Sequence, residues 1–427
     1  MYFQKGFGLK SEVGPVLART YQSAVVERLK AIGYEASAGG LHFKLAKEFG
    51  FCYGVDRAVD YAYQTRRQFP DRRVFLSGEI IHNPDVNDRI QAMGIRILAD
   101  SRDPAERFKD VASGDVVILP AFGVSVPELA QLKAKNCVLV DTTCGSVLNV
   151  WKKVNYYARD GYTVIIHGKH HHEETLATAS QALTHDGGQY LCVRDVAETE
   201  IVCDFIRGRI SGADLMAKFR EAASPNFDPD QHLQRIGLAN QTTMLMSETL
   251  KVQETLRRAM VERYGETDLE SRFRAFDTIC SATQERQDAV LEMLEAGGLD
   301  LMVVIGGYNS SNTQALARMC APRVTTYYID SPQCVTDAGI RHRAFGATEE
   351  TLAAAWLPAG DVRIGITAGA STPDSVVGET IERILALRGR KAEDLTQPAH
   401  IEEGSPTFAK ATVDKPTYAE ATAGKQS

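Results

Sequence analysis

The chain has 427 residues, of which 44% are hydrophobic and 24% are charged, and its formal net charge is −7. This length and composition allow several buried cores, so we expect two or three domains. The acidic balance argues against a general nucleic-acid binder. No run approaches the roughly 18 apolar residues that a membrane-spanning helix requires, and the N-terminus lacks the apolar core of a signal peptide. We therefore expect a cytoplasmic protein without membrane insertion.

The predicted elements begin with a helical extension over residues 1–41, where YQSAVVERLKAIG has the clearest helical pattern. From about residue 42 to residue 390, apolar strand-like runs alternate with helical patterns. Several runs, such as VVILPAFG, TVIIHGK and LMVVIGG, are continuous, as expected of strands that are buried on both faces. The pattern predicts an α/β fold with parallel sheets. Residues 204–235 resemble a charged surface insertion, and residues 392–427, which have little to bury, predict a mobile tail.

Three of the eight cysteines share one sequence context. Cys52, Cys144 and Cys280 each follow an apolar or alternating run and precede an amphipathic helical pattern. Each is expected just before or within the first turn of a helix, where backbone N–H groups and the helix dipole favour a thiolate. Three such thiolates indicate three modules around one metal centre. The other cysteines share no common context: Cys137, Cys192, Cys203, Cys320 and Cys334.

Cysteine usage also limits the kind of metal site. The chain contains no C-x-x-C pair, which excludes the usual ferredoxin and zinc-ribbon spacings. The wide, irregular spacing fits a reducing compartment better than a disulfide scaffold. For any one of the cysteines, a buried structural role is the simpler interpretation, because free cysteine is among the most buried residue types. The shared context of the three is what favours a metal site.

Polar side chains follow several predicted strands, at the sheet edge where parallel α/β folds gather ligands. His82 lies in EIIHNPDVN, His172 and Glu174 lie in the histidine-rich loop HGKHHHEET, and Thr242 lies in NQTTM. A histidine-rich loop can also be a solvated turn or an adventitious metal binder. The succession of such loops after strands nevertheless favours one shared site.

Two further loops place hydroxyl and amide groups at predicted helix starts. GGYNSSNT contains Ser310, Ser311 and Asn312, and AGASTPD contains Ser371 before a proline. Residues of these types commonly cap helices, and for Asn312 or Ser371 alone capping is the first interpretation. Together with helix N-termini, such groups form an anion site that suits phosphate oxygens.

These segments together resemble a known family. FCYGVDRAV, EIIHNPDVN, DTTC, HHEET, NQTTM, TICSATQERQDAV, GGYNSSNT and AGASTPD are similar, in this order, to the signature segments of the 4-hydroxy-3-methylbut-2-enyl diphosphate reductases, the IspH/LytB family. The resemblance covers roughly residues 42–385, and the extension, the insertion and ILPAFGVS are similar to the long cyanobacterial and plastid form. It implies reductive dehydroxylation of that diphosphate to isopentenyl and dimethylallyl diphosphate, the last step of the methylerythritol phosphate route to isoprenoids.

The resemblance also implies a fold and a cofactor. We expect three similar α/β modules with small parallel sheets, in a trefoil-like arrangement around a central [4Fe–4S] cluster, one per chain. Cys52, Cys144 and Cys280 would hold it, leaving one iron without a protein ligand for the substrate oxygen. The expected parts of the chain are a helical extension at 1–41, module 1 at 42–143, module 2 at 144–276, module 3 with a return helix at 277–391, and a tail at 392–427.

Roles in catalysis and binding carry over by motif. Glu174 corresponds to the family's proton-delivering glutamate, and Thr242 corresponds to the threonine near the substrate hydroxyl. Two positions depart from the common pattern: Phe122 stands where many bacterial members have histidine, and Gly145 stands where proline is common. The residues implied to contact the substrate are His82, His172, Thr242, Ser310, Ser311, Asn312 and Ser371.

Two other classes of protein remain open at this point. A zinc-dependent hydrolase acting on a phosphorylated small molecule could use Cys and His ligands with Glu174 as the base, and a redox sensor could use the three cysteines alone. The reductase interpretation implies a ferredoxin or flavodoxin-type electron donor, for which Arg66, Arg67, Arg72 and Arg73 offer a basic patch. It also favours a bacterial cytoplasm, or the plastid stroma if a transit peptide has been removed.

Overall fold

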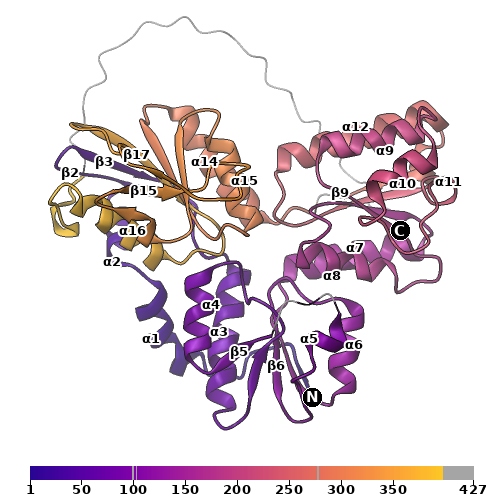
Figure 1. Ribbon diagram of the computed structural model, residues 1–427, viewed down its shortest axis with the longest axis horizontal. Coiled ribbons are helices and arrows are strands. Elements are labelled where there is room, and N and C mark those ends of the chain that lie inside the picture. The colour runs from indigo at the N-terminus through magenta and orange to yellow at the C-terminus, as the bar shows by residue number, and fades with distance from the viewer. Residues whose placement is uncertain (99–100, 102, 277, 398–427) are drawn as a thin grey trace, which may run out of the picture.

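The computed structural model describes residues 1–98, 101, 103–276 and 278–397. Figure 1 shows three α/β lobes, each built on its own sheet. Neighbouring strands are parallel in all three sheets, except for the pair formed by β2 (Glu35–Ala38) and β3 (Leu41–Leu45), which is antiparallel. The predicted α/β fold with several small parallel sheets is confirmed.

The first module has the strand order β1-β7-β6-β4-β5. Its core forms because α3 turns one face of valines and alanines, such as Val55 and Val59, onto Val74 and Leu76 of the sheet. The strands are β1 (Tyr2–Phe3), β4 (Val74–Leu76), β5 (Ile95–Ile97), β6 (Val116–Leu119) and β7 (Val138–Asp141), and the helices are α1 (Lys10–Tyr21), α3 (Tyr53–Gln68), α4 (Pro84–Ala92), α5 (Pro104–Arg107) and α6 (Val126–Ala134).

The second module has the strand order β11-β10-β8-β9. α7 buries Val150, Val154 and Tyr157 against this sheet, at the helical spacing seen in the sequence. The strands are β8 (Thr163–His167), β9 (Tyr190–Val193), β10 (Ile236–Asn240) and β11 (Phe273–Ala275), and the helices are α7 (Gly145–Arg159), α8 (Glu173–Ala182), α9 (Val196–Ile206), α10 (Gly212–Phe219), α11 (Pro229–His232), α12 (Met246–Tyr264) and α13 (Leu269–Arg272).

The third module has the strand order β13-β12-β17-β3-β2, with a small antiparallel sheet β14-β15-β16 beside it. α14 packs on one face of the main sheet through Val290 and Met293, and α16 packs on the other through Val377 and Ile381. The remaining elements are α2 (Ala24–Ala31), α14 (Ser281–Ala296), β12 (Leu301–Ile305), α15 (Ser311–Cys320), β13 (Thr325–Ile329), η1 (Pro332–Cys334), β14 (Val335–Thr336), β15 (Gly339–His342), β16 (Thr351–Ala353), β17 (Val362–Ala368), α16 (Asp374–Ala386) and η2 (Ala392–Asp394).

The module boundaries differ from the expected ones at the N-terminus. β3 begins at residue 41, where module 1 was expected to start, yet it pairs with β17 in the third module. The segment 1–41 is not only helical: β1 joins the first sheet and β2 joins the third. A strand of five residues has the same apolar pattern in either sheet, so local sequence does not reveal its partner.

Two other expectations also change. The segment 204–235 is part of the second module rather than a surface insertion, because Leu215, Phe219 and Leu233 are buried in that module's core. The prediction of a mobile tail from residue 392 is wrong for its first residues, where η2 (Ala392–Asp394) forms. Leu395 is fully buried, and Thr396 bridges to Ser37. The remainder of that prediction, residues 398–427, lies outside the described residues.

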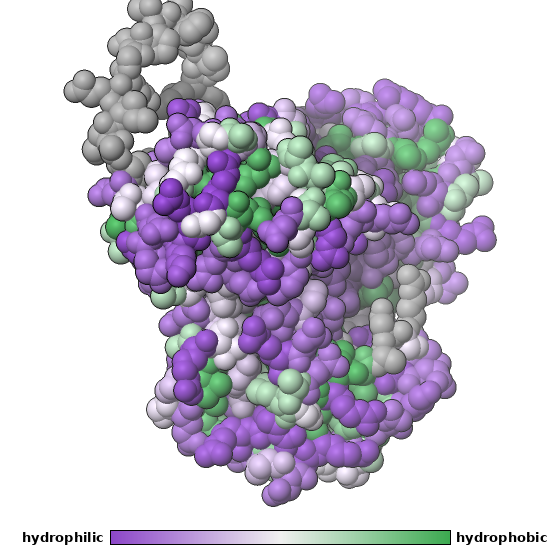
Figure 2. Space-filling view, turned by 60° about the vertical axis from the view of Figure 1, so that its left-hand side comes forward, coloured by the Kyte–Doolittle hydropathy of each residue, from purple (hydrophilic) through white to green (hydrophobic). Residues whose placement is uncertain are grey.

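The surface visible in Figure 2 is mostly hydrophilic. On the face in Figure 2, hydrophilic side chains predominate and hydrophobic ones form small patches. Among the helices that the structure describes, none combines the length and the apolar character that crossing a membrane requires.

Candidate active site

The three cysteines of the shared sequence context each cap a helix. Cys52 is the N-cap of α3, Cys144 of α7 and Cys280 of α14, and all three have extended backbone angles. One cavity is lined by all three, and its other lining residues come from each of the three modules. The repeated run-cysteine-helix unit therefore delivers one thiol per module to a common centre.

Gly54, in the first turn of α3, lies beside the thiols of both Cys52 and Cys144. A Cβ atom added at Gly54 would lie 2.5 Å from Cys144 Sγ and 3.9 Å from Cys52 Sγ. Only a residue without a side chain leaves room there, because real Cβ atoms do not approach within 3 Å of such an atom. Gly54 therefore keeps a small cradle open between two sulfur atoms.

Burial changes the expected ionisation of two of the thiols, those of Cys52 and Cys280. Desolvation raises the pKa of Cys52, and it raises the pKa of Cys280 to about 11. This differs from the thiolate preference expected at helix starts, because the cost of burying a charge exceeds the helix contribution. Three sulfur donors in an enclosed cavity are the ligand set that iron–sulfur clusters use, and a bound metal deprotonates such thiols outright. The donor chemistry thus fits a cluster.

Side chains with hydroxyl and amide groups surround the start of α15. Ser310 is the N-cap of this helix and accepts from Thr313 N, and Ser311 and Asn312 follow it, all of them buried. Asn312 Oδ1 accepts from Ala370 N at 2.8 Å, whereas its buried Nδ2 has no hydrogen-bond partner among the described residues. A buried amide donor without a partner costs free energy, so this Nδ2 is available to a hydrogen-bond acceptor.

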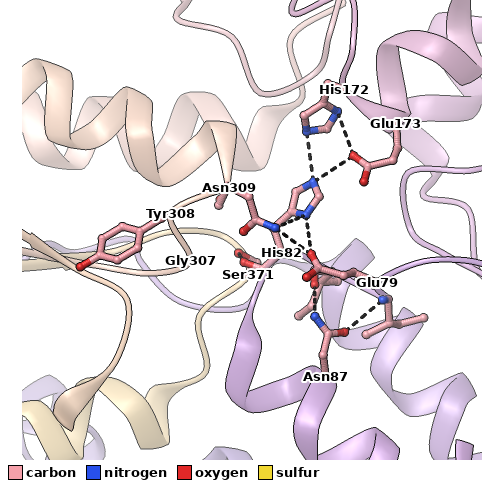
Figure 3. A network of polar contacts seen from close by, with 12 residues as sticks. Glu79, His82, Asn87, His172, Glu173, Gly307, Tyr308, Asn309 and Ser371 are labelled. Atoms are coloured by element: carbon pink, nitrogen blue, oxygen red, sulfur yellow. Dashed lines mark hydrogen bonds and ion pairs between the residues drawn. The ribbon is translucent and has the colours of Figure 1, made fainter. Parts of the chain in front are cut away.

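The two histidines of the cavity form one directional chain of hydrogen bonds, shown in Figure 3. Glu174 N donates to His172 Nδ1 at 3.1 Å, so the proton of a neutral His172 sits on Nε2. Burial lowers the pKa of His172 well below its ordinary value. His172 Nε2 then donates to His82 Nε2 at 3.2 Å, and His82 Nδ1 donates to Glu79 Oε2 at 2.9 Å. The backbone thereby fixes the tautomer of both rings.

Glu174 lies in the first turn of α8, and its side chain points into the same cavity. The residue is 1% exposed, and its Oε1 accepts from Thr242 N at 2.6 Å. Desolvation raises the pKa of Glu174 to about 7, against the opposing effect of the Thr242 hydrogen bond. A carboxyl group with such a pKa can hold a proton near neutral pH and release it, as a general acid requires.

Comparison with known proteins decides the family. The family model LytB protein matches residues 43–385. The chain is 48% identical over 396 residues to the 4-hydroxy-3-methylbut-2-enyl diphosphate reductase of Gloeobacter violaceus, covering 91% of this chain and 93% of the relative. It is 46% identical over 388 residues to the enzyme of the same name from Synechococcus sp. CC9311, covering 90% and 96%. The chain belongs to the LytB family.

A solved LytB-family structure shows the same fold. The structure of the E-1-hydroxy-2-methyl-but-2-enyl-4-diphosphate reductase from Plasmodium falciparum superposes with a TM-score of 0.59 at 20% sequence identity, over 81% of this chain and 87% of that one. This likeness supports the three-module α/β architecture.

The cavity of this LytB-family chain brings together every residue that the sequence singled out for the site. Of the histidine-rich loop, His172 lines the cavity, whereas His167 contacts Thr249 and His170 and His171 line a separate cleft. The cavity is lined by the candidates Cys52, His82, Cys144, His172, Glu174, Thr242, Cys280, Ser310, Ser311, Asn312 and Ser371.

Phe122, where many family members have histidine, has a defined place in this site. Its ring stacks on His82 with centroids 4.2 Å apart and an interplanar angle of 19°, and it meets His172 edge-on. It cannot donate a hydrogen bond, but it holds the His82 ring in its plane. Gly145, the other departure, opens α7 without a side chain and has no neighbour that a Cβ would meet within 4 Å.

The sequence missed Glu79 and Gly54 as contributors to the site, and it did not predict the contact that Asn309, a polar residue at a predicted helix start, makes there. Glu79 binds His82, Asn309 donates to Glu79 at 2.8 Å, and Gly54 leaves room for the sulfur atoms. Glu79 stands three residues before His82 in EIIHN, and Gly54 stands two after Cys52. Their closeness in the sequence to motif residues was the available signal. A contact between distant segments, such as that of Asn309 with Glu79, leaves no signal in the local sequence.

Proposed function

We propose that this chain reduces 4-hydroxy-3-methylbut-2-enyl diphosphate to isopentenyl and dimethylallyl diphosphate, using one [4Fe–4S] cluster held by Cys52, Cys144 and Cys280. The convergence of three helix-capping cysteines on one cavity carries this proposal. When bound, the cluster supplies electrons and an iron without a protein ligand. In the net reaction the C–O bond of the substrate hydroxyl breaks, two electrons and two protons are consumed, and water leaves.

The chain's own residues provide binding and the proton. The diphosphate would lie against the α15 start, where Ser310, Ser311 and Asn312 offer donors together with the helix N-terminus. Ser371, whose hydroxyl donates to His82 O at 3.1 Å, lies on the opposite loop. These groups orient the substrate so that its hydroxyl faces the cysteines rather than solvent.

Glu174 is the proposed proton source for the leaving hydroxyl. Thr242 N occupies Oε1, which leaves Oε2 to carry and deliver the proton. The Thr242 hydroxyl lines the cavity beside it and would contact the substrate oxygen. Hydroxide is a poor leaving group, so a positioned acid is needed at this atom.

The electron donor would be a ferredoxin or flavodoxin-type carrier. The basic patch expected to dock it lies at the far end of α3 from Cys52, and two of its arginines are already paired, Arg67 with Glu12 and Arg73 with Asp115. Tyr53, which adjoins Cys52, is 82% exposed and marks a shorter route from solvent to the cysteines. We place the docking area there. A bacterial cytoplasmic location is also proposed, which the cyanobacterial relatives support.

A zinc hydrolase is the second candidate, because His82, His172 and Glu173 offer ligand atoms within 4.8 Å of one another. Protein purified without oxygen separates the two. The reductase predicts a brown solution with about four irons per chain, whereas the hydrolase predicts a colourless zinc protein. Cys280→Ser should lose iron and Cys334→Ser, at a buried position outside the cavity, should keep it. Full iron and activity in Cys280→Ser would refute the ligand assignment.

A further inference from the structure

Arg286 is a buried cation on the helix that Cys280 caps. It lies on α14, one and a half turns after Cys280, and only 3% of it is exposed. Its guanidinium donates three hydrogen bonds, all to backbone carbonyls: Nε and Nη2 to Gly50 O at 3.2 and 2.8 Å, and Nη1 to Ala282 O at 2.8 Å. Hydrogen bonds satisfy most of the donors of this guanidinium, but no negative group among the described residues balances its positive charge.

No carboxylate of the described residues lies within 4 Å of Arg286 as an ion-pair partner. Asp374 touches the same loop, since its Oδ1 lies 2.7 Å from where a Cβ of Gly50 would be. That carboxylate is already bound by Lys30 at 2.7 Å. A buried, uncompensated charge is costly, so the fold of the protein alone does not account for an arginine at this position.

The neighbouring groups that lack a positive partner are the cysteines. Arg286 donates to the carbonyl of Gly50, two residues before Cys52, so its positive charge lies beside the Cys52 loop. A [4Fe–4S] core with three thiolates is anionic, and reduction makes it more so. A fixed positive charge next to such a cluster stabilises the reduced form more than the oxidised form, because net charge and hydrogen bonding set cluster potentials.

Arg286 also joins two of the three modules. It belongs to the helix that Cys280 caps, and it grips Gly50, two residues before Cys52. Arg57 repeats this arrangement: it belongs to the helix that Cys52 caps and donates to the carbonyls of Thr142 and Thr143, directly before Cys144. Two arginines thus tie each of two cysteine loops to the helix of another cysteine.

We propose that Arg286 is a positioning residue that supplies the compensating charge for the anionic cluster and raises its reduction potential, while it holds the Cys52 loop to the Cys280 helix. This inference rests on the proposed cluster. Its consequence is a cluster that accepts electrons from a weaker reductant than it could without the arginine. Arg57 acts in the same way on the Cys144 loop, but it is more exposed and its charge is better screened.

The test compares Arg286→Gln, Arg286→Lys and a control, Arg28→Gln, in protein purified without oxygen. Lysine keeps the charge and loses the planar fork, whereas glutamine loses the charge. Arg28 is also bound by backbone carbonyls, of Ala392 and Leu395, but it is remote from the cavity. The readouts are iron per chain and the cluster's midpoint potential, measured by a dye-mediated redox titration that is followed by visible absorption.

Arg286→Gln should weaken the electron affinity of the cluster at least about ten-fold, which is 59 mV for a one-electron couple. The electron affinity of the cluster in Arg286→Lys should stay within about three-fold of wild type, and that in Arg28→Gln should equal wild type. If Arg286→Gln is isolated without iron, retention of iron by Arg286→Lys supports the proposal. Equal behaviour of the glutamine and lysine variants, in potential or in iron loss, overturns it. Absence of iron from the wild-type chain would instead overturn the proposed function itself.

Discussion

Replacing Glu174 by glutamine should separate the chemistry of this carboxyl group from its place in the fold. The amide keeps the shape of the side chain, and its oxygen can still accept from Thr242 N. It has no dissociable proton. A positioned general acid contributes roughly 100-fold or more to rate, so turnover should fall by at least that factor while the cluster absorption remains.

Stability should change in the opposite direction, by an amount that grows as the pH rises from about 4.5 to about 7. Burial raises the pKa of Glu174 from its ordinary 4.5 to about 7, a difference worth about 3 kcal/mol. Because the folded-state value is the higher one, the stabilisation is fully present below pH 4.5 and is lost as the pH rises through 7. Above pH 8 the wild-type chain therefore buries an ionised carboxylate at this cost, which Glu174→Gln avoids.

Two assays on the same anaerobic samples check this reasoning. Reduction of substrate by dithionite with a viologen dye measures turnover, and thermal unfolding at pH 6 and pH 8.5 measures stability. We expect a variant that is nearly inactive and whose gain in melting temperature over wild type is larger at pH 8.5 than at pH 6. A normal cluster with near-normal turnover would remove Glu174 from the mechanism, and a melting difference that is independent of pH would refute its raised pKa.

Two further variants test the cradle and the anion site. Gly54→Ala should preserve α3, since alanine favours helices by about 1 kcal/mol over glycine, yet it should lose most iron, because the new Cβ would meet Cys144 Sγ at 2.5 Å. Full iron content by metal analysis would contradict the close approach of the thiols to this position. Gly145→Ala is the matched control, because a Cβ there meets nothing within 4 Å. Asn312→Ala should weaken inhibition by inorganic diphosphate about ten-fold, because it removes a buried amide donor that has no partner among the described residues; the absorption spectrum serves as the control for an intact cluster, and undiminished inhibition would locate the anion site elsewhere.

Local sequence foresaw the position of each cysteine well. Helical spacing after Cys52 and Cys144 and a run of apolar residues before them are local signals, and the structure has each as the N-cap of its helix. The raised pKa of the Cys52 and Cys280 thiols, which disfavours their charged form, was not foreseeable. A helix start is visible in the sequence, but burial of the Cys280 sulfur depends on segments far away in the chain.

Contacts between modules could not be predicted from local sequence either, because they too depend on segments far apart in the chain. The five-residue strand β3 pairs with β17, more than 300 residues later, and its own pattern does not name that partner. Phe122 is a similar case, since its role depends on the face that it presents to His82. The sequence identified the substitution there, but only the fold defines the stacking that replaces a hydrogen bond.

The pairing of β3 with β17 has a consequence for how the chain is made. During synthesis, N-terminal parts of a chain fold first, and the first sheet can close once β7 has emerged. β3 must wait, with one edge open, until β17 follows it out of the ribosome. Such distant pairing is slow and leaves an aggregation-prone edge. A nascent chain that ends before residue 362 therefore lacks the central strand of its third sheet, so the third module is completed last.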